Sequence, residues 1–190
     1  RVLFRSKRGH PLKIGFIDVK KAHLFGLRKR KIFIELPAED RSEGMVGELV
    51  YSLYGTRDAA HNWEETYGEH LVSKDFKAGL SNPCLFINLQ VDITLLVHGD
   101  DFVFVTDFIG VKWFQGVMEE KFIIKLRAVL GGEPGDDHEV RILNRFVRWR
   151  VDVRPPRIEY EADPRHGEQV LKTLGLTGAK SVTSPTVKDR

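Results

Sequence analysis

The sequence predicts an α/β (α+β) fold in which a split β-α-β-β-α-β antiparallel sheet carries helices on one face. Strand-like runs at residues 12–19 and 31–36 precede an amphipathic helical pattern that begins near Thr56. Two further strand-like runs flank a Gly-Asp-Asp turn, and a second helical pattern follows at residues 113–118. Helices packed on one face leave the other face of such a sheet free for a substrate.

Apolar spacing in the first half of the chain defines its strands and first helix. The run LKIGFIDV is apolar and β-branched, which is typical of a strand, and the next run, KIFIEL, stops at Pro37 because proline cannot donate to a ladder. A third strand is expected at residues 85–89. The helical stripe consists of apolar side chains at every fourth position, namely Ala59, Trp63, Tyr67 and Leu71.

The C-terminal part is predicted to form a β ribbon and a helix. After the turn-rich loop GGEPGDD, residues 140–151 are expected to pair with residues 157–161. Asp163 as N-cap and Gly175 just past the end bracket a last helix. We therefore expect one domain over residues 1–190, in which the ribbon and the last helix follow the sheet.

Composition limits the class of protein. The chain has 190 residues, 42% hydrophobic and 30% charged, which is enough for one sizeable core. Its single cysteine, Cys84, permits no internal disulfide and favours an intracellular compartment, the cytoplasm or nucleus, over secretion. No apolar run approaches the roughly 20 residues that span a bilayer, so no membrane is expected among the partners.

Basic residues are concentrated near the N-terminus. The net charge is only +3, but residues 1–31 contain eleven Lys or Arg and one acid, Asp18. Such a segment could face the phosphates of a nucleic acid, or its run at residues 28–31 could simply solvate a loop. Composition leaves both interpretations open.

The segment ITLLVHGDDFVFVT, residues 93–106, predicts a hairpin whose tip carries two adjacent carboxylates. Side chains alternate along a strand, so Asp100 and Asp101 approach one ion only through a tight turn, which Gly99 favours. Paired carboxylates suit a hard divalent cation such as Mg²⁺, and a third carboxylate is expected elsewhere in the chain. Because Gly-Asp is a common turn dipeptide, an ordinary hairpin tip is the alternative.

Three segments in their order resemble the motifs of copia-type retrotransposon reverse transcriptases. FIDVKKAHLFG at 16–26 resembles the family's Asp-Val-Lys-x-Ala-Phe-Leu-x-Gly motif, and the segment at 49–76 resembles its Ser-Leu-Tyr-Gly motif with a downstream Trp. LLVHGDDFVFV at 95–105 is similar to the family's Tyr-x-Asp-Asp motif, and the C-terminal segment at 158–188 is also similar. The resemblance covers about residues 12–188 and implies part of a Pol polyprotein.

The resemblance implies a polymerase palm over about residues 12–127 and a post-palm, thumb-like segment over about 128–190. It implies an RNA-directed DNA polymerase, a nucleotidyltransferase that adds deoxynucleotides from their triphosphates to a primer on an RNA or DNA template. The implied partners are therefore template, primer, deoxynucleoside triphosphates and other parts of the polyprotein.

Site residues follow from the same resemblance. It implies that Asp18, Asp100 and Asp101 are the catalytic metal ligands, assisted by the backbone carbonyl of Val19, with Asp18 and Asp100 as the principal ligands and Asp101 as a more peripheral one. The implied cofactor is two Mg²⁺ ions, for which Mn²⁺ can substitute. In this two-metal chemistry one ion activates the primer 3′-hydroxyl and the other holds the triphosphate and its leaving group.

Several positions depart from the family's motifs. His23 stands where the family usually has Phe, at the position expected to face the incoming sugar, and His98 replaces the usual Tyr. Asp58 stands where many relatives carry a nucleotide-contacting Gln. The chain begins 17 residues before Asp18, so we expect most of the fingers to be missing and no robust polymerisation by this chain alone. Whether the chain by itself is an active enzyme stays open.

Two other functions are compatible with the sequence. One is a non-catalytic palm that binds nucleic acid through the basic N-terminal segment and through Arg145, Arg148 and Arg150, which lie on a strand expected to be a solvated sheet edge. The other is a nucleotide cyclase, because HGDDFVF also resembles the Gly-Gly-Asp-Glu-Phe turn of diguanylate cyclases. The second acidic position is Asp101 rather than Glu, which favours the polymerase.

Overall fold

A computed structural model describes residues 5–180 of the chain. It forms two compact units, one that runs to Val140 and one that begins at Arg141, and each is described by itself. The end of the C-terminal resemblance, residues 181–188, lies outside the described residues.

A six-stranded sheet in the order β4-β5-β6-β7-β1-β8 is the centre of the first unit, and all its neighbouring strands are antiparallel. Its strands are β1 (Lys13–Val19), β4 (Lys77–Ala78), β5 (Leu85–Asn88), β6 (Ile93–His98), β7 (Asp101–Thr106) and β8 (Ile124–Leu130). A one-turn helix, η1 (Ala22–Phe25), follows β1. The alternating burial of β6 and β7 reflects a sheet with two unlike faces.

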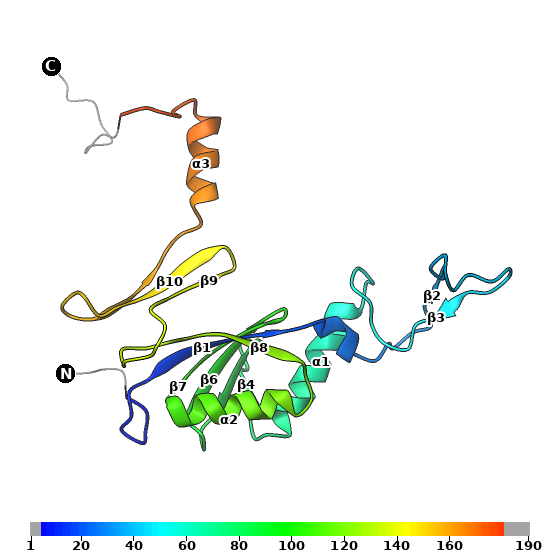
Figure 1. The fold of residues 1–190 in the computed structure, drawn as a ribbon, viewed down its shortest axis with the longest axis horizontal. Coiled ribbons are helices and arrows are strands. Elements are labelled where there is room, and N and C mark those ends of the chain that lie inside the picture. The colour runs from blue at the N-terminus through cyan, green and yellow to red at the C-terminus, as the bar shows by residue number, and fades with distance from the viewer. Residues whose placement is uncertain (1–4, 181–190) are drawn as a thin grey trace. The chain divides into compact units, whose positions relative to one another are not determined.

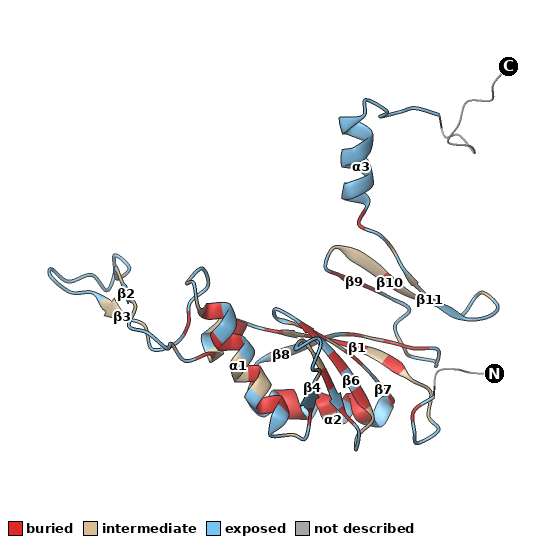
Figure 2. Ribbon diagram, turned by 180° about the vertical axis from the view of Figure 1, so that it is seen from behind, coloured by how far each residue is buried: buried red, intermediate tan, exposed pale blue. Residues whose placement is uncertain are grey.

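Helices α1 (Ala59–Val72) and α2 (Phe108–Glu119) pack on one face of this sheet (Figure 1). The predicted stripe of α1 is confirmed, because all four of its residues are buried. They join a core of aromatic and aliphatic side chains from both helices and the strands, including Phe102, Phe104, Phe114 and Met118. Figure 2 shows buried residues alternating with exposed ones along α1. The predicted mixed α/β architecture with antiparallel sheets is therefore confirmed.

A buried carboxylate fixes the start of α2. Asp107 accepts hydrogen bonds from the amides of Ile109 and Gly110, at 3.1 and 3.0 Å, and both its oxygens accept from Arg8, at 2.8 and 2.7 Å. Burial favours the neutral acid, but the hydrogen bonds from Arg8 and Gly110 outweigh it and hold the pKa of Asp107 well below its usual range. The residues before β1 are thereby tied to the start of α2.

The predicted strand at residues 31–36 is wrong in extent. Only β2 (Phe33–Ile34) pairs, with β3 (Gly47–Glu48), in a separate two-stranded sheet. No apolar layer covers this ribbon, since Phe33 is 57% exposed, and an uncovered two-stranded ribbon gains little from burial. The alternating pattern therefore produces only a short ladder here.

The second unit contains most of a three-stranded sheet in the order β11-β10-β9, made of β9 (Glu139–Ile142), β10 (Arg145–Arg150) and β11 (Arg157–Tyr160). The expected pairing across the two prolines is confirmed by β10 and β11. The single strand expected at 140–151 is wrong, because the turn residues Leu143 and Asn144 have φ of +47° and +62° and reverse the chain. β10 is consequently the central strand of this sheet, so the expectation that its arginines lie on a solvated sheet edge is wrong.

The last helix, α3 (Pro164–Thr173), begins and ends as predicted. The side chain of Asp163 accepts from the Arg165 amide at 3.0 Å, and Gly175, with φ of +66°, follows the helix end. All residues of α3 are exposed (Figure 2). Among residues 5–180, no helix has the length and apolar character needed to cross a membrane.

Candidate functional site

Two of the three predicted carboxylates are direct neighbours across the centre of the sheet. Asp18, near the end of β1, is the antiparallel partner of Asp101, the first residue of β7. Side chains at directly opposite positions share a face, with Cβ atoms roughly 4.5–5.5 Å apart. The amide of Val19 donates to the backbone carbonyl of Asp100 at 2.9 Å and extends the contact to the turn. The fold therefore brings residues from distant parts of the sequence to one place.

These carboxylates lie on the sheet face that α1 and α2 do not cover. Their neighbours along the strands, Ile17, Val19 and Phe102, are buried in the core beneath the helices. Because successive side chains alternate, Asp18 and Asp101 point to the opposite face. Both are half-buried rather than fully exposed. Neither α1 nor α2 therefore lies between these carboxylates and a substrate.

The turn that carries Asp100 is held from the helix side. Gly99 has φ of +63°, a left-handed conformation that glycine adopts without strain. Its carbonyl accepts a hydrogen bond from the indole N–H of Trp63 at 2.8 Å, and Trp63 is buried in the core. Asp100 itself is exposed at the tip. The hairpin tip is therefore fixed by its backbone, and the carboxylate of Asp100 remains accessible to solvent.

A row of four polar residues crosses the face that α1 and α2 leave uncovered. Strand pairing aligns His98 on β6 with Asp101 on β7, then Asp18 on β1, then Lys125 on β8. A positively charged residue thus flanks the two carboxylates on the β8 side.

A second cation reaches the carboxylates from a bulge. β8 changes register between its partners Leu126 and Ala128, which leaves Arg127 out of the ladder with β1. Arg127 donates to Oδ1 of Asp101 at 3.3 Å. The sequence analysis did not identify Lys125 or Arg127 as site residues, since Lys-Leu-Arg shows only the polar and apolar alternation of an ordinary strand.

Electrostatics at Asp101 show that the carboxylates act on one another. Burial raises the pKa of Asp101, the positive charge of Arg127 lowers it, and the negative charges of Asp100 and Asp18 raise it further, so that the pKa is above its usual value. Asp100 and Asp18 therefore each lie close enough to Asp101 to repel its charge. A bound cation would relieve that repulsion.

The donor set fits a magnesium ion in type and number. Mg²⁺ takes oxygen ligands and is commonly held by one or two carboxylates, with water and substrate phosphates completing its shell. Asp18 and Asp101 supply such a pair. Residues 5–180 contain no cluster of three or more His, Cys, Asp or Glu side chains arranged to hold a metal, so Asp100 is near the pair without closing a three-carboxylate set. The carbonyl role expected for Val19 stays a prediction.

His23 and His98 line one cavity beside the hairpin tip. His23 lies in η1, directly after β1, and its ring contacts that of Tyr54, with centroids 4.3 Å apart. The cavity measures about 220 Å³, and its wall also includes Trp63 and Gly99. The Nδ1 atom of His23 is buried without a hydrogen-bond partner. The expected sugar-facing residue is thus next to the carboxylate turn, and Tyr54 is a neighbour that the sequence did not indicate.

Most of the basic run at residues 28–31 is paired with acids. Arg28 pairs with Glu48, Lys29 with Glu65 and Arg30 with Asp58. These ion pairs neutralise positive charge that could otherwise attract a phosphate group. They also give Asp58 a partner within the chain.

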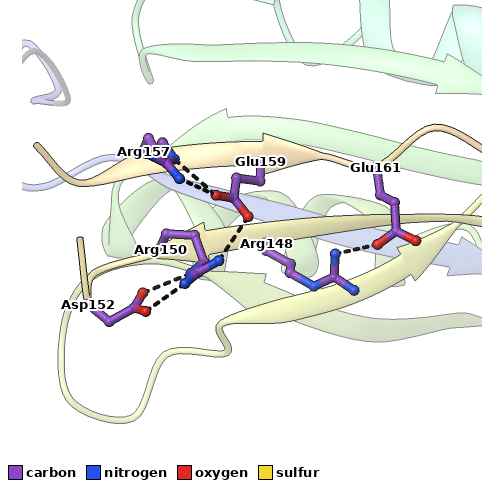
Figure 3. A network of polar contacts seen from close by, with 6 residues as sticks. All are labelled: Arg148, Arg150, Asp152, Arg157, Glu159 and Glu161. Carbon is purple, nitrogen blue, oxygen red and sulfur yellow. Dashed lines mark hydrogen bonds and ion pairs between the residues drawn. The ribbon is translucent and has the colours of Figure 1, made fainter. Parts of the chain in front are cut away.

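The arginines of β10 are compensated in the same way (Figure 3). Arg148 pairs with Glu161, and Arg150 donates to Asp152 and Glu159 at 2.6 and 3.0 Å. The Arg145 guanidinium lies 5.2 Å from the centroid of the Tyr160 ring. This ladder of alternating charges lowers the net positive field of the strand, which disfavours it as a nucleic-acid binding stripe.

Comparison with known proteins gives a set of relatives of one kind. The chain is 25% identical over 181 residues to the retrovirus-related Pol polyprotein from transposon TNT 1-94 of Nicotiana tabacum, which covers 92% of this chain and 13% of that protein. It is 25% identical over 135 residues to the transposon Ty1-NL2 Gag-Pol polyprotein of Saccharomyces cerevisiae, covering 70% of this chain and 8% of that protein. A truncated transposon Ty1-A Gag-Pol polyprotein of the same yeast is also 25% identical, over 138 residues.

No family model matches the chain. The relatives nevertheless show that the chain is homologous to retrotransposon Pol and Gag-Pol polyproteins. It spans 13% of the length of the tobacco relative and less of the yeast Ty1-NL2 relative.

Proposed function

We propose that this chain is the palm region of a copia-type reverse transcriptase, an RNA-directed DNA polymerase within a Pol polyprotein. The observation that carries the proposal is the direct pairing of Asp18 with Asp101, with Asp100 at the adjoining turn. Homology to the tobacco and yeast polyproteins supports the same assignment. The reaction is transfer of a deoxynucleotide to the 3′-hydroxyl of a primer on an RNA or DNA template.

Asp18, Asp100 and Asp101 are the residues that would hold the metal ions, with the carbonyl of Val19 as a further oxygen donor. Bound Mg²⁺ supplies positive charge that stabilises the attacking 3′-oxygen and the departing pyrophosphate. The protein's own contribution is positioning, because β1 and β7 fix the two carboxylates on one face and Trp63 holds the turn beside them.

His23 is the proposed contact for the sugar of the incoming nucleotide. It lies in the one-turn helix after the Asp18 strand, and its flat ring lies against Tyr54 beside the cavity at the hairpin tip. A planar side chain at this position would pack beneath the sugar. The histidine thereby replaces the phenylalanine of the family's motif in shape, although it adds a polar nitrogen.

The test is primer extension on RNA and DNA templates with Mg²⁺ or Mn²⁺, using the chain alone and the same chain joined to the polyprotein segment that precedes it. Asp18→Asn and Asp101→Asn remove one negative charge each at constant shape. Asp40→Asn, at an exposed position on the loop between β2 and β3, is the matched control.

Extension that is retained in Asp40→Asn and falls by at least about 100-fold in both site variants supports the proposal, since such losses are typical when one stabilising charge is removed. Extension that survives both site substitutions contradicts it. A template-independent cyclic dinucleotide formed from GTP would instead identify a cyclase.

A further inference from the structure

Arg127 has an unusual position in the sheet. β8 borders β1 on the side away from β7, so Asp101 lies two strands from Arg127. The register change in β8 frees Arg127 from the ladder, and its side chain crosses β1 to donate to Asp101. A residue in regular register on β8 would be paired with β1 instead, as Lys125 is with Asp18.

The contact places a cation at an atom that a metal ion would use. Arg127 Nη1 lies 3.3 Å from Oδ1 of Asp101, and the side chains are 35% and 14% exposed. Opposite charges attract each other at this distance. Arg127 and a divalent cation therefore compete for the same carboxylate, and they repel each other if both are bound.

Arg127 supplies positive charge at Asp101 when no metal ion is bound. Asp101 has two acidic neighbours, Asp100 before it in the chain and Asp18 opposite it on β1, and the guanidinium of Arg127 donates to its carboxylate. The guanidinium is always protonated and strongly attracted to phosphate as well as to carboxylate. It can therefore leave Asp101 when a phosphate group beside the carboxylates provides an alternative partner.

We propose that Arg127 is an internal counter-ion that occupies Asp101 and weakens divalent-metal binding until phosphate draws it away. This inference rests on the proposed function, because it takes Asp101 to be a metal ligand. Arg127 is then a positioning residue that acts through Asp101. Metal binding and phosphate binding become coupled, so that the metal is held firmly only when the nucleotide or nucleic-acid backbone is present.

The test measures Mn²⁺ affinity directly from the electron paramagnetic resonance signal of the free ion, without any catalytic assay. Arg127→Gln removes the positive charge and keeps much of the side-chain length. Arg127→Lys keeps the charge, and Arg41→Gln removes a charge from the exposed Glu35 pair in the loop between β2 and β3. Unfolding curves of each variant establish that it is folded.

Arg127→Gln is expected to bind Mn²⁺ about tenfold more tightly than the native chain, because one competing charge is gone, whereas Arg127→Lys and Arg41→Gln stay within about twofold. The gain should vanish in the Asp101→Asn background, where Arg127 has no carboxylate to mask. Added inorganic pyrophosphate should bring the native chain closer to the Arg127→Gln variant after correction for Mn²⁺ bound to pyrophosphate itself.

Equal Mn²⁺ affinity in the native chain and Arg127→Gln, with a clear loss in Asp101→Asn, would overturn this inference and leave the proposed metal site standing. An affinity that does not respond to Asp101→Asn would overturn both. A gain that persists in the Asp101→Asn background would also refute the counter-ion role.

Discussion

Replacing Asp107 by alanine is expected to lower the free energy of unfolding of the sheet unit by about 3 kcal/mol at pH 7. The carboxylate caps two amides of α2 and accepts two hydrogen bonds from Arg8. Loss of the cap costs about 1 kcal/mol. Hydrogen bonds to a charged group contribute about 1.5–3 kcal/mol, and the lower half of that range applies because the Arg8 side chain is 31% exposed and partly screened.

The pH dependence of this loss follows from the depressed pKa of Asp107. Arg8 and the helix amides stabilise the ionised form of Asp107 in the folded state. Their contribution to the free energy of unfolding is therefore fully present above the unfolded-state pKa of about 3.9, and it is lost as pH falls towards the lower folded-state pKa. The difference between native chain and variant should be constant from pH 5 to 7 and shrink progressively below about pH 4.

Urea unfolding followed by tryptophan fluorescence measures both effects, with Asp40→Ala as a control at an exposed position. A loss under 1 kcal/mol at pH 7, or a loss that is undiminished at pH 2, would refute the reasoning. A double-mutant cycle with Arg8→Ala should give a coupling energy of at least about 1 kcal/mol, because Arg8 and Asp107 contact each other directly and either substitution alone removes that contact.

Three further predictions concern packing. Gly15→Ala is expected to destabilise the chain by roughly 1–3 kcal/mol in urea unfolding, because an added Cβ would lie 2.1 Å from Cζ of the buried Phe104 ring; an unchanged midpoint would contradict this. Gly68→Ala should stabilise by about 0.5–1 kcal/mol, since no atom lies within 4 Å of its Cβ and alanine favours the interior of α1; destabilisation would count against it. Trp63→Phe should cost about 2 kcal/mol and loosen the turn, seen as faster hydrogen exchange near residue 99, because the bond to the Gly99 carbonyl is lost; unchanged exchange there would argue against the role of the indole.

Local patterns predicted the elements whose signals are strong and self-contained. The four-residue spacing of Trp63, Tyr67 and Leu71 marks the buried side of α1, and Asp163 with Gly175 marks the ends of α3. In each case the signal lies within one element and matches its geometry.

The missed features depend on conformations or partners that local patterns do not encode. Leu143 adopts a left-handed conformation that its side chain disfavours, so Asn144 is the single weak turn signal in the strand-like run at 140–151. The contact between Arg127 and Asp101 depends on a bulge in β8 and on the order of three strands. The pairing of Asp18 with Asp101 likewise depends on tertiary structure, since a shared role for them came only from the resemblance to a family.

The central claim is that carboxylates from β1 and from the β6–β7 turn meet at one divalent ion. Fe²⁺ in place of Mg²⁺, with ascorbate and hydrogen peroxide, generates hydroxyl radicals at the ion and cleaves the backbone nearby. Mass spectrometry of the fragments then locates the ion along the sequence. We predict cleavage near both Asp18 and Asp100–Asp101, suppressed by excess Mg²⁺ and lost in Asp101→Asn. Cleavage near only one of these segments, or at unrelated positions, would contradict the claim.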